Sequence, residues 1–427
     1  MKWLVRHSRL TSGVLDVPGD KSISHRALMF AALAEGRSEL QNLGPGADVV
    51  STASCLEALG TRVTPVDGWV AVDGGAFRPS ADVLDAGNSG TTMRLLSGIL
   101  AGQSFPSTLT GDDSLRRRPM LRVARPLEEM GARVTTSDGH APLHINGGGL
   151  HGIRYEMPVP SAQVKSCVLL AGLFANGKTT VHETLQTRDH TERMLRATGV
   201  PVAQDELSTT VRGGSRPHAF NLSVPGDFSS AAFLLAVGAL FEGMIVRDVG
   251  INPTRTAFLS VLERMGCRIE TTGEEERAGE PVATVTVAPT SLSGIEIGSD
   301  EAPEMLDELP LVALLAAVAT GDTKVTGAAE LRVKESDRIA TITSELGRLG
   351  ADISELSDGF VVRGRGLQGL TGAECEAHGD HRVAMTLSLA GMLAKGETTV
   401  NGAESVDISY PSFAATLRSL GANIDEV

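Results

Sequence analysis

The sequence lacks any long hydrophobic run. Its nearly uninterrupted apolar stretches, residues 231–241 and 311–319, are far shorter than the ~20 residues that cross a bilayer. Near the amino end, Lys2, Arg6 and Arg9 interrupt the region where a secretion signal would be purely apolar. We therefore expect a cytoplasmic protein without a membrane segment.

Cysteine and positive charge are also scarce. The four cysteines lie far apart, without the paired C-x-x-C spacing of a zinc site or the density of a disulfide framework, which predicts reduced, packed thiols. The formal net charge of −14 argues against a nucleic-acid-binding surface, which depends on many lysine and arginine contacts. Any anion-binding site must therefore be local.

The 427 residues of the chain are too many for one ordinary hydrophobic core, so two or more domains are expected. The sequence also contains an internal repeat. Small-residue-rich apolar segments each end at a glycine, and each unit of roughly 70 residues carries a second glycine suited to a helix C-cap. The first set is Gly36, Gly102, Gly177, Gly243, Gly321 and Gly396, and the second is Gly60, Gly131, Gly199, Gly266, Gly350 and Gly421.

The order of helix-like and strand-like segments in each repeat predicts an α/β unit. The order is a helix such as 27–34, a strand such as 179–182, a second helix such as 123–130 and a strand such as 133–136. Segment 229–241 is apolar on nearly every face, which is typical of a buried helix. A doubly wound nucleotide-binding fold would also alternate helices and strands, but no G-x-G-x-x-G or P-loop sequence follows any strand.

Polar residues precede the apolar helices. Serine, asparagine and aspartate there have a simple explanation as caps of free backbone N–H groups. A cation at the positive end of a helix dipole is unfavourable without an anion, so Lys21, Arg26, Arg94 and Arg382 indicate bound phosphate or carboxylate. Gly90 would let the backbone come close to such a ligand.

Two further basic clusters lie in the later half of a repeat. Segment 112–125 includes Arg118, and segment 331–338 would place Lys334 and Arg338 on one helical face if it is helical. Surface charge explains an arginine run equally well. The equivalent places of the two clusters in different repeats favour a functional role.

Several strings in these segments follow one another in a recognisable order. They are VPGDKSISHR (17–26), GNSGTTMR (87–94), RPM (118–120), SAQVKS (161–166), TRDHTE (187–192), RVKESDR (332–338) and DHR (380–382). Together they closely resemble the EPSP synthase family of enolpyruvyl transferases. SAQVKS and TRDHTE are similar to its class II branch, whereas Gly90 is similar to the more usual form.

The resemblance implies an α/β fold of two similar domains. Each would contain three repeated α/β units with buried helices, in an inside-out α/β barrel. Residues 1–16 and 228–427 would form domain 1 and residues 17–227 domain 2, because Asp227 opens the fourth repeat. The active site would lie in the cleft between the domains, which would close over both substrates.

The resemblance also implies a reaction without a metal or organic cofactor. The 5-hydroxyl of shikimate 3-phosphate would add to C2 of phosphoenolpyruvate as C3 is protonated, and phosphate would then leave the tetrahedral intermediate. By the matching motifs, Asp307 would be the base, Glu335 would donate and remove the proton at carbon, and Lys21 could share the proton transfer. A helix N-cap is the alternative role for Asp307.

The same matching assigns two sets of binding residues. Shikimate 3-phosphate would contact Lys21, Ser22, Arg26, Ser161, Gln163, Arg188, Asp307 and Lys334. Phosphoenolpyruvate would contact Lys21, Gly90, Arg118, Gln163, Arg338 and Arg382. Four positions depart from some family members, which have a proline at Leu95, a second serine at Ala162, an asparagine at Glu330 and a lysine at Ile408. Because Ile408 carries no charge, the motifs provide no fifth cation for phosphoenolpyruvate.

Two alternatives stay open. UDP-N-acetylglucosamine enolpyruvyl transferases share the six-repeat design but usually carry a reactive cysteine in the loop that is residues 111–120 here, which contains none. A non-catalytic scaffold that binds small anions would be expected to lose the carboxylates of Asp307 and Glu335. We expect a monomer that acts on the two small-molecule substrates, with no nucleic-acid or membrane partner.

Overall fold

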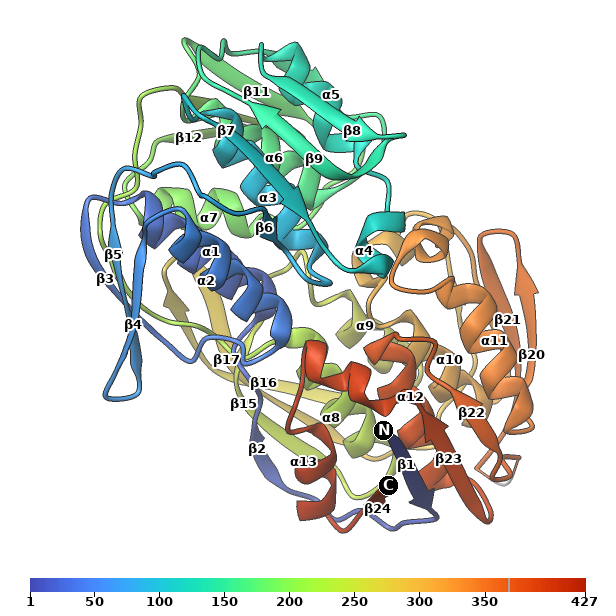
Figure 1. Cartoon of the computed structure of the whole chain (residues 1–427). Coiled ribbons are helices and arrows are strands. Elements are labelled where there is room, and N and C mark those ends of the chain that lie inside the picture. Colours follow the sequence, from blue (N-terminus) through green and yellow to red (C-terminus); the bar gives the residue numbers. More distant parts are fainter. Residues whose placement is uncertain (368) are drawn as a thin grey trace. The chain divides into compact units, whose positions relative to one another are not determined.

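The computed structural model describes every residue of the chain except residue 368 (Figure 1). By its internal contacts the chain forms two compact units. Unit 1 comprises Met1–Pro18, Gly226–Glu275 and Pro281–Val427, and unit 2 comprises Gly19–Pro225 and Glu276–Glu280. Within the described part of the chain, no helix has both the length and the hydrophobicity needed to cross a membrane.

Unit 2 is built from three sheets of one design. In each, an edge strand is parallel to its neighbour, and that neighbour is antiparallel to the next strand. The sheets have the orders β14-β3-β5-β4, β6-β7-β9-β8 and β10-β11-β13-β12. Their strands are β3 Gly36–Gln41, β4 Arg62–Val66, β5 Trp69–Gly74, β6 Leu84–Asp85, β7 Pro106–Thr110, β8 Arg133–Ser137, β9 His140–Asn146, β10 Arg154–Glu156, β11 Lys178–His182, β12 Val202–Asp205, β13 Ser208–Arg212 and β14 Asn221–Ser223.

Unit 1 has the same design in three further sheets. Their orders are β16-β17-β15-β2, β18-β19-β21-β20 and β22-β23-β1-β24, so the first strand of the chain lies between two of the last. The strands are β1 Lys2–Arg6, β2 Val14–Asp16, β15 Met244–Gly250, β16 Arg268–Arg277, β17 Glu280–Ala288, β18 Glu296–Ile297, β19 Thr320–Val325, β20 Asp352–Leu356, β21 Gly359–Arg365, β22 Glu374–Glu376, β23 Glu397–Asn401 and β24 Asn423–Glu426. Six like sheets among the described residues confirm the repeated α/β design predicted from the glycine markers.

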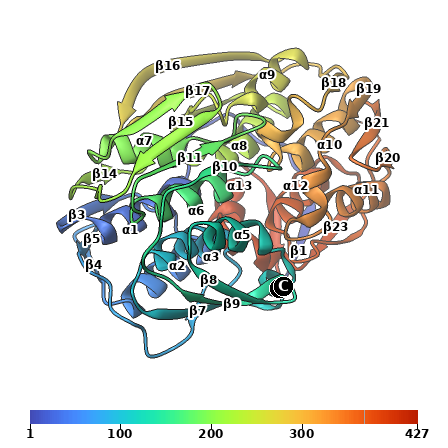
Figure 2. The same cartoon turned by 90° about the horizontal axis from the view of Figure 1, so that it is seen from above.

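Each unit has three central helices that are buried on nearly every face. In unit 2 they are α1 Lys21–Leu33, α3 Gly90–Ala101 and α6 Ala162–Gly172, and in unit 1 they are α8 Phe228–Leu240, α10 Leu309–Val318 and α12 His381–Leu393. Figure 2 shows β20 and β21 outside α10 and α12. A helix with apolar residues all round must be enclosed by other elements, so the sheets cover these helices.

The remaining helices each have one buried face. They are α2 Ala47–Ala58, α4 Asp113–Arg117, α5 Leu121–Glu129, α7 His190–Ala197, α9 Ala257–Arg264, α11 Arg338–Arg348 and α13 Phe413–Ser419, with 3₁₀ helices at Ala302–Met305, Ala329–Val333 and Ala403–Ile408. Several end at a glycine with positive φ, as at Gly131 (φ 104°) and Gly350 (φ 92°). These glycines lie just beyond the helix, where the left-handed conformation releases the chain into the next strand, as the sequence predicts.

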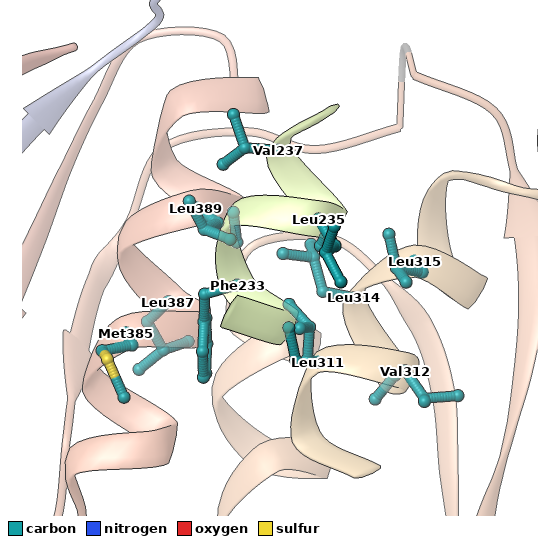
Figure 3. Packing of buried hydrophobic residues seen from close by; sticks show 14 of the residues in the cluster. Phe233, Leu235, Val237, Leu311, Val312, Leu314, Leu315, Met385, Leu387 and Leu389 are labelled. Atoms are coloured by element: carbon teal, nitrogen blue, oxygen red, sulfur yellow. The ribbon is translucent and has the colours of Figure 1, made fainter. Parts of the chain in front are cut away.

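The core of unit 1 depends on contacts among α8, α10 and α12. Figure 3 shows Phe233 and Leu235 of α8 packed among Leu311 and Leu314 of α10 and Leu387 of α12, and all five side chains are at most 1% exposed. All three helices contribute apolar side chains to this core, most of them small or aliphatic. This packing fixes the positions of the N-terminal ends of the three helices.

Substitution of one of these side chains is expected to weaken unit 1. Leu314→Ala should lower the free energy of unfolding by about 2–5 kcal/mol, because it removes buried contacts and leaves a cavity. Leu367→Ala is the matched control, since Leu367 is 55% exposed and should change stability by less than about 0.5 kcal/mol. Urea unfolding followed by circular dichroism measures both, and equal effects would contradict this description of the core.

Candidate active site

The polar residues that precede the buried helices act as N-caps. The side chains of Asp20, Ser89, Ser161, Asp227 and Asp380 each accept a hydrogen bond from a backbone N–H in the first turn of α1, α3, α6, α8 and α12. The capping interpretation is therefore right for these residues, including Ser161. It is wrong for Asp307, because the N-cap position of α10 is Glu308.

In unit 2, two cations extend from the first turns of α1. Lys21 Nζ lies 3.2 Å from Asp48 Oδ2 of α2. Arg26 is buried and donates from Nε to Thr191 Oγ1 (2.7 Å), from Nη1 to the Ser22 carbonyl (2.8 Å) and from Nη2 to Ser166 Oγ (2.8 Å). Burial lowers the pKa of Arg26 to about 10, so the group is still charged at neutral pH.

Arg188 lies in the loop between β11 and α7. Its positive charge contributes, after burial, to the lowered pKa of Arg26, which places the two cations within electrostatic reach of each other. Ser161, at the start of α6, is partly buried and its Oγ accepts from the backbone N–H of Val164 (3.4 Å). Unit 2 thus contributes three of the cations assigned to shikimate 3-phosphate, two from α1 and one from the loop before α7.

A second group in unit 2 surrounds the start of α3. Arg94 Nη1 donates to Gln163 Oε1 (2.5 Å), and Arg118 Nη2 donates to Asn88 Oδ1 (2.8 Å). A Cβ added at Gly90 would lie 2.7 Å from Arg94 Nη1 and 3.3 Å from Arg118 Nη1. Two guanidinium groups therefore approach the backbone at the N-terminus of a buried helix, which is the chemistry of an anion site.

The basic run around Arg118 divides into two kinds of residue. Arg116 and Arg117 are exposed, and Arg116 contacts Asp113 at 3.8 Å in the same short helix. Arg118 is buried at the end of α4. The surface-charge interpretation holds for Arg116 and Arg117, whereas Arg118 is the only buried residue of these three arginines.

In unit 1, Arg338 is the centre of an ionic cluster. The residue is 1% exposed, and its Nε, Nη1 and Nη2 lie 2.7 Å from Asp380 Oδ2, 3.1 Å from Asp307 Oδ1 and 2.7 Å from Glu335 Oε2. Burial alone would lower the pKa of Arg338, but Asp380, Glu335 and Asp307 together raise it. The two carboxylates predicted for acid–base chemistry, Asp307 and Glu335, thus share one buried cation.

Lys334 lies beside this cluster. It is half-buried, and burial followed by repulsion from Arg338 lowers its pKa, while Asp307 and Glu335 oppose that effect. Lys334 and Arg338 do not share a helix, which corrects the conditional prediction for this segment. Lys334 follows the 3₁₀ helix Ala329–Val333, whereas α11 begins at Arg338 after the N-cap Asp337.

Arg382, in the first turn of α12, differs from Arg338 in its surroundings. It is 3% exposed, yet its Nε and Nη1 atoms make no hydrogen bond to any residue that the structure describes. A buried cation without a partner is costly unless an anion binds there. Arg382 is therefore placed to bind an anionic group in unit 1.

Sequence reasoning gave Asp380 only a capping role and Asp48 no role, although the two carboxylates hold Arg338 and Lys21. Asp380 stands inside the DHR string and so offered a signal, but its partner Arg338 lies 42 positions earlier. Asp48 is 27 positions from Lys21 and belongs to no string that marks a site. Among the described residues, no group of His, Cys, Asp or Glu side chains is arranged to hold a metal ion.

The contrast between the two arginines gives a stability prediction. Arg338→Met should lower the free energy of unfolding by about 3–5 kcal/mol, because three carboxylates lose their shared cation. Arg382→Met should leave stability unchanged or raise it, because a buried charge without a partner is removed. Thermal unfolding of the ligand-free variants measures the difference, and equal losses would contradict the assignment of Arg382.

Comparisons with known proteins agree with these features. A model of the EPSP synthase (3-phosphoshikimate 1-carboxyvinyltransferase) family matches residues 5–417. The 3-phosphoshikimate 1-carboxyvinyltransferase of Geobacillus kaustophilus is 48% identical over 96% of this chain and 97% of its own, and that of Gloeobacter violaceus is 51% identical over 95% and 96%. The solved EPSP synthase of Acinetobacter baumannii is 40% identical, covers 100% of both chains and superposes with a TM-score of 0.89. The chain therefore belongs to the EPSP synthase family.

Proposed function

We propose that the cation clusters of units 1 and 2 together bind the two substrates of the family reaction, and that Asp307 and Glu335 transfer its protons. The activity is that of a 3-phosphoshikimate 1-carboxyvinyltransferase, which transfers the enolpyruvyl group of phosphoenolpyruvate to the 5-hydroxyl of shikimate 3-phosphate. The products are 5-enolpyruvylshikimate 3-phosphate and phosphate. The names of the relatives favour this acceptor over UDP-N-acetylglucosamine.

One observation carries the proposal. Arg338 contacts both Asp307 and Glu335, and the same three groups act on the pKa of Lys334. The proposed acid–base groups, Asp307 and Glu335, therefore lie in the same cluster as two cations that can bind anions, Arg338 and Lys334. A scaffold that only binds anions has no use for carboxylates at this point, because they repel its ligand.

The binding assignments come from the matching family motifs, and the charges of the substrates support them. Each substrate carries a phosphate and a carboxylate, so the site needs several cations that are already desolvated. For shikimate 3-phosphate the assigned residues are Lys21, Ser22, Arg26, Ser161, Gln163, Arg188, Asp307 and Lys334. For phosphoenolpyruvate they are Lys21, Gly90, Arg118, Gln163, Arg338 and Arg382. Ile408 ends a 3₁₀ helix as a half-buried apolar residue and supplies no further cation.

The proposed mechanism couples substrate binding to proton transfer. Asp307 accepts the proton of the 5-hydroxyl as its oxygen bonds to C2 of phosphoenolpyruvate, and Glu335 delivers a proton to C3. Both carboxylates contact Arg338, which is also assigned to phosphoenolpyruvate, so substrate binding and proton transfer involve the same cluster. In the elimination Glu335 takes a proton back from C3 as the C2–O bond to phosphate breaks, and the proton held by Asp307 goes to the departing phosphate.

The site is proposed to form between two domains, residues 1–16 with 228–427 and residues 17–227, that close over the substrates. Both assigned sets combine residues of unit 1 with residues of unit 2. We also infer a monomer in the cytoplasm. The four cysteines are free and buried, which suits a reducing compartment.

The role of Asp307 is tested by its removal. Asp307→Ala should retain substrate binding but lose about 10²- to 10⁴-fold in kcat, the usual contribution of a positioned acid–base group. Phosphate release measures turnover, and fluorescence titration measures binding. Asp300→Ala is the control, because Asp300 is exposed in the same segment before α10. Unchanged turnover of Asp307→Ala would reject the base.

The role of Gly90 is tested by adding one methyl group. Gly90→Ala should raise the KM for phosphoenolpyruvate and leave the KM for shikimate 3-phosphate near its wild-type value, because the Cβ would press on Arg94 and Arg118. The fold is expected to tolerate the change, since the ends of two flexible side chains move. Gly347→Ala is the control, because a Cβ there would meet no atom within 4 Å outside its chain neighbours and the backbone of its own helix. Equal rises of both KM values would contradict the placement of Gly90.

A further inference from the structure

A buried ionic cluster in unit 2 has no part in the binding sets assigned above. Lys165 of α6 is 1% exposed, and its Nζ lies 2.7 Å from Glu183 Oε2 and 2.7 Å from Glu192 Oε1. Glu183 follows β11, and Glu192 lies in the first turn of α7. The three charges come from three elements, so each carboxylate ties its own element to α6.

The electrostatics show that the cluster holds its charges by mutual contact. Burial lowers the pKa of Lys165, but Glu192 and Glu183 together raise it above its usual value. Burial raises the pKa of Glu183, and Lys165 opposes that effect. Glu192 also supports the charge of the nearby Arg26. Such groups break apart only at a large cost, which makes the cluster a rigid support.

The cluster holds a loop that leads directly to Arg188. Glu183 Oε1 accepts a hydrogen bond from the backbone N–H of Thr187 (3.1 Å) and another from Thr187 Oγ1. Lys165 Nζ also donates to the Thr187 carbonyl (3.4 Å). Thr187 is thus fixed through its N–H, its hydroxyl and its carbonyl, and the next residue is Arg188.

The other end of the loop is fixed as well. Asp189 accepts from Arg193 Nε at 2.8 and 2.9 Å, and Thr191 Oγ1 lies 2.6 Å from Ser166 Oγ, the neighbour of Lys165 in α6. The residues on both sides of Arg188 therefore have defined partners. Arg188 itself is only half-buried.

We propose that Lys165, Glu183 and Thr187 are positioning residues that hold the backbone at Arg188 so that its guanidinium meets the acceptor substrate. They act on the affinity for shikimate 3-phosphate through Arg188 and touch neither substrate. A long arginine side chain on a free loop would lose conformational entropy on binding, and the support reduces that loss. This inference rests on the proposed contact between Arg188 and shikimate 3-phosphate.

Thr187→Val tests whether the hydrogen bonds of Thr187 hold the backbone at Arg188, and it removes a single hydroxyl. It removes the hydroxyl bond to Glu183 and keeps the shape and the backbone bond. We expect the KM for shikimate 3-phosphate to rise about 2- to 10-fold, the usual effect of one lost hydrogen bond. The kcat and the KM for phosphoenolpyruvate should change less than about twofold. Glu183→Gln, which removes the charge at nearly constant volume, should give the same split between the two KM values.

The matched control is Thr180→Val. Thr180 lies in β11 of the same sheet, and its hydroxyl bonds Thr210 Oγ1 at 2.8 Å, so this variant also loses one side-chain hydrogen bond. It should leave both KM values unchanged. A rise in the KM for shikimate 3-phosphate equal to that of Thr187→Val would show a general effect on the sheet and would overturn the proposal.

A double-mutant cycle separates the support from the assignment of Arg188. Arg188→Ala should raise the KM for shikimate 3-phosphate, and adding Thr187→Val should raise it no further, because Thr187 acts through Arg188. Additive effects would overturn the support while leaving the contact of Arg188 intact. An unchanged KM in Arg188→Ala would overturn the contact with the substrate and the support with it.

Discussion

The central constraint on this structure is that cations must stay charged where water is excluded. Arg338 meets the constraint with three carboxylates, at 2.7 Å from Asp380, 3.1 Å from Asp307 and 2.7 Å from Glu335. Because two of these carboxylates, Asp307 and Glu335, are the proposed acid–base groups, binding and chemistry are joined in one cluster. Arg382 lacks such partners among the described residues, and we infer that the substrate completes its surroundings.

The fold brings such groups together through its repeat. Three apolar helices are buried in each unit, and the N-terminal end of each presents backbone N–H groups with a capping side chain in most cases. The N-terminus of a helix attracts anions through its partial positive charge but supplies no full cation to pair with them. Lys21, Arg26, Arg94 and Arg382 supply it from within or near the first turn of their helices. The repeat thus makes several equivalent positions, and we propose that those with a cation bind the anionic groups of the substrates.

Much of this arrangement could be predicted from the sequence because it is local. Helix caps, the glycines after helices such as Gly131, and the uniformly apolar α8 depend on neighbouring residues, and the structure confirms them. The family motifs added roles for Asp307 and Glu335 that spacing alone does not give. Long-range pairing could not be predicted: Lys165 meets Glu183 and Glu192 only because β11 and α7 pack beside α6. Segment 331–338 was also ambiguous, and a turn separates Lys334 from the helix that begins at Arg338.

The most direct test is a crystal structure of the protein with shikimate 3-phosphate and an unreactive analogue of phosphoenolpyruvate. The proposed function predicts that Arg118 of unit 2 and Arg338 and Arg382 of unit 1 all lie within hydrogen-bonding distance of the same analogue molecule. It also predicts that Asp307 lies next to the 5-hydroxyl of shikimate 3-phosphate. An analogue bound by the residues of one unit alone, with Arg382 still without an anion, would contradict the proposal that both clusters form one active site.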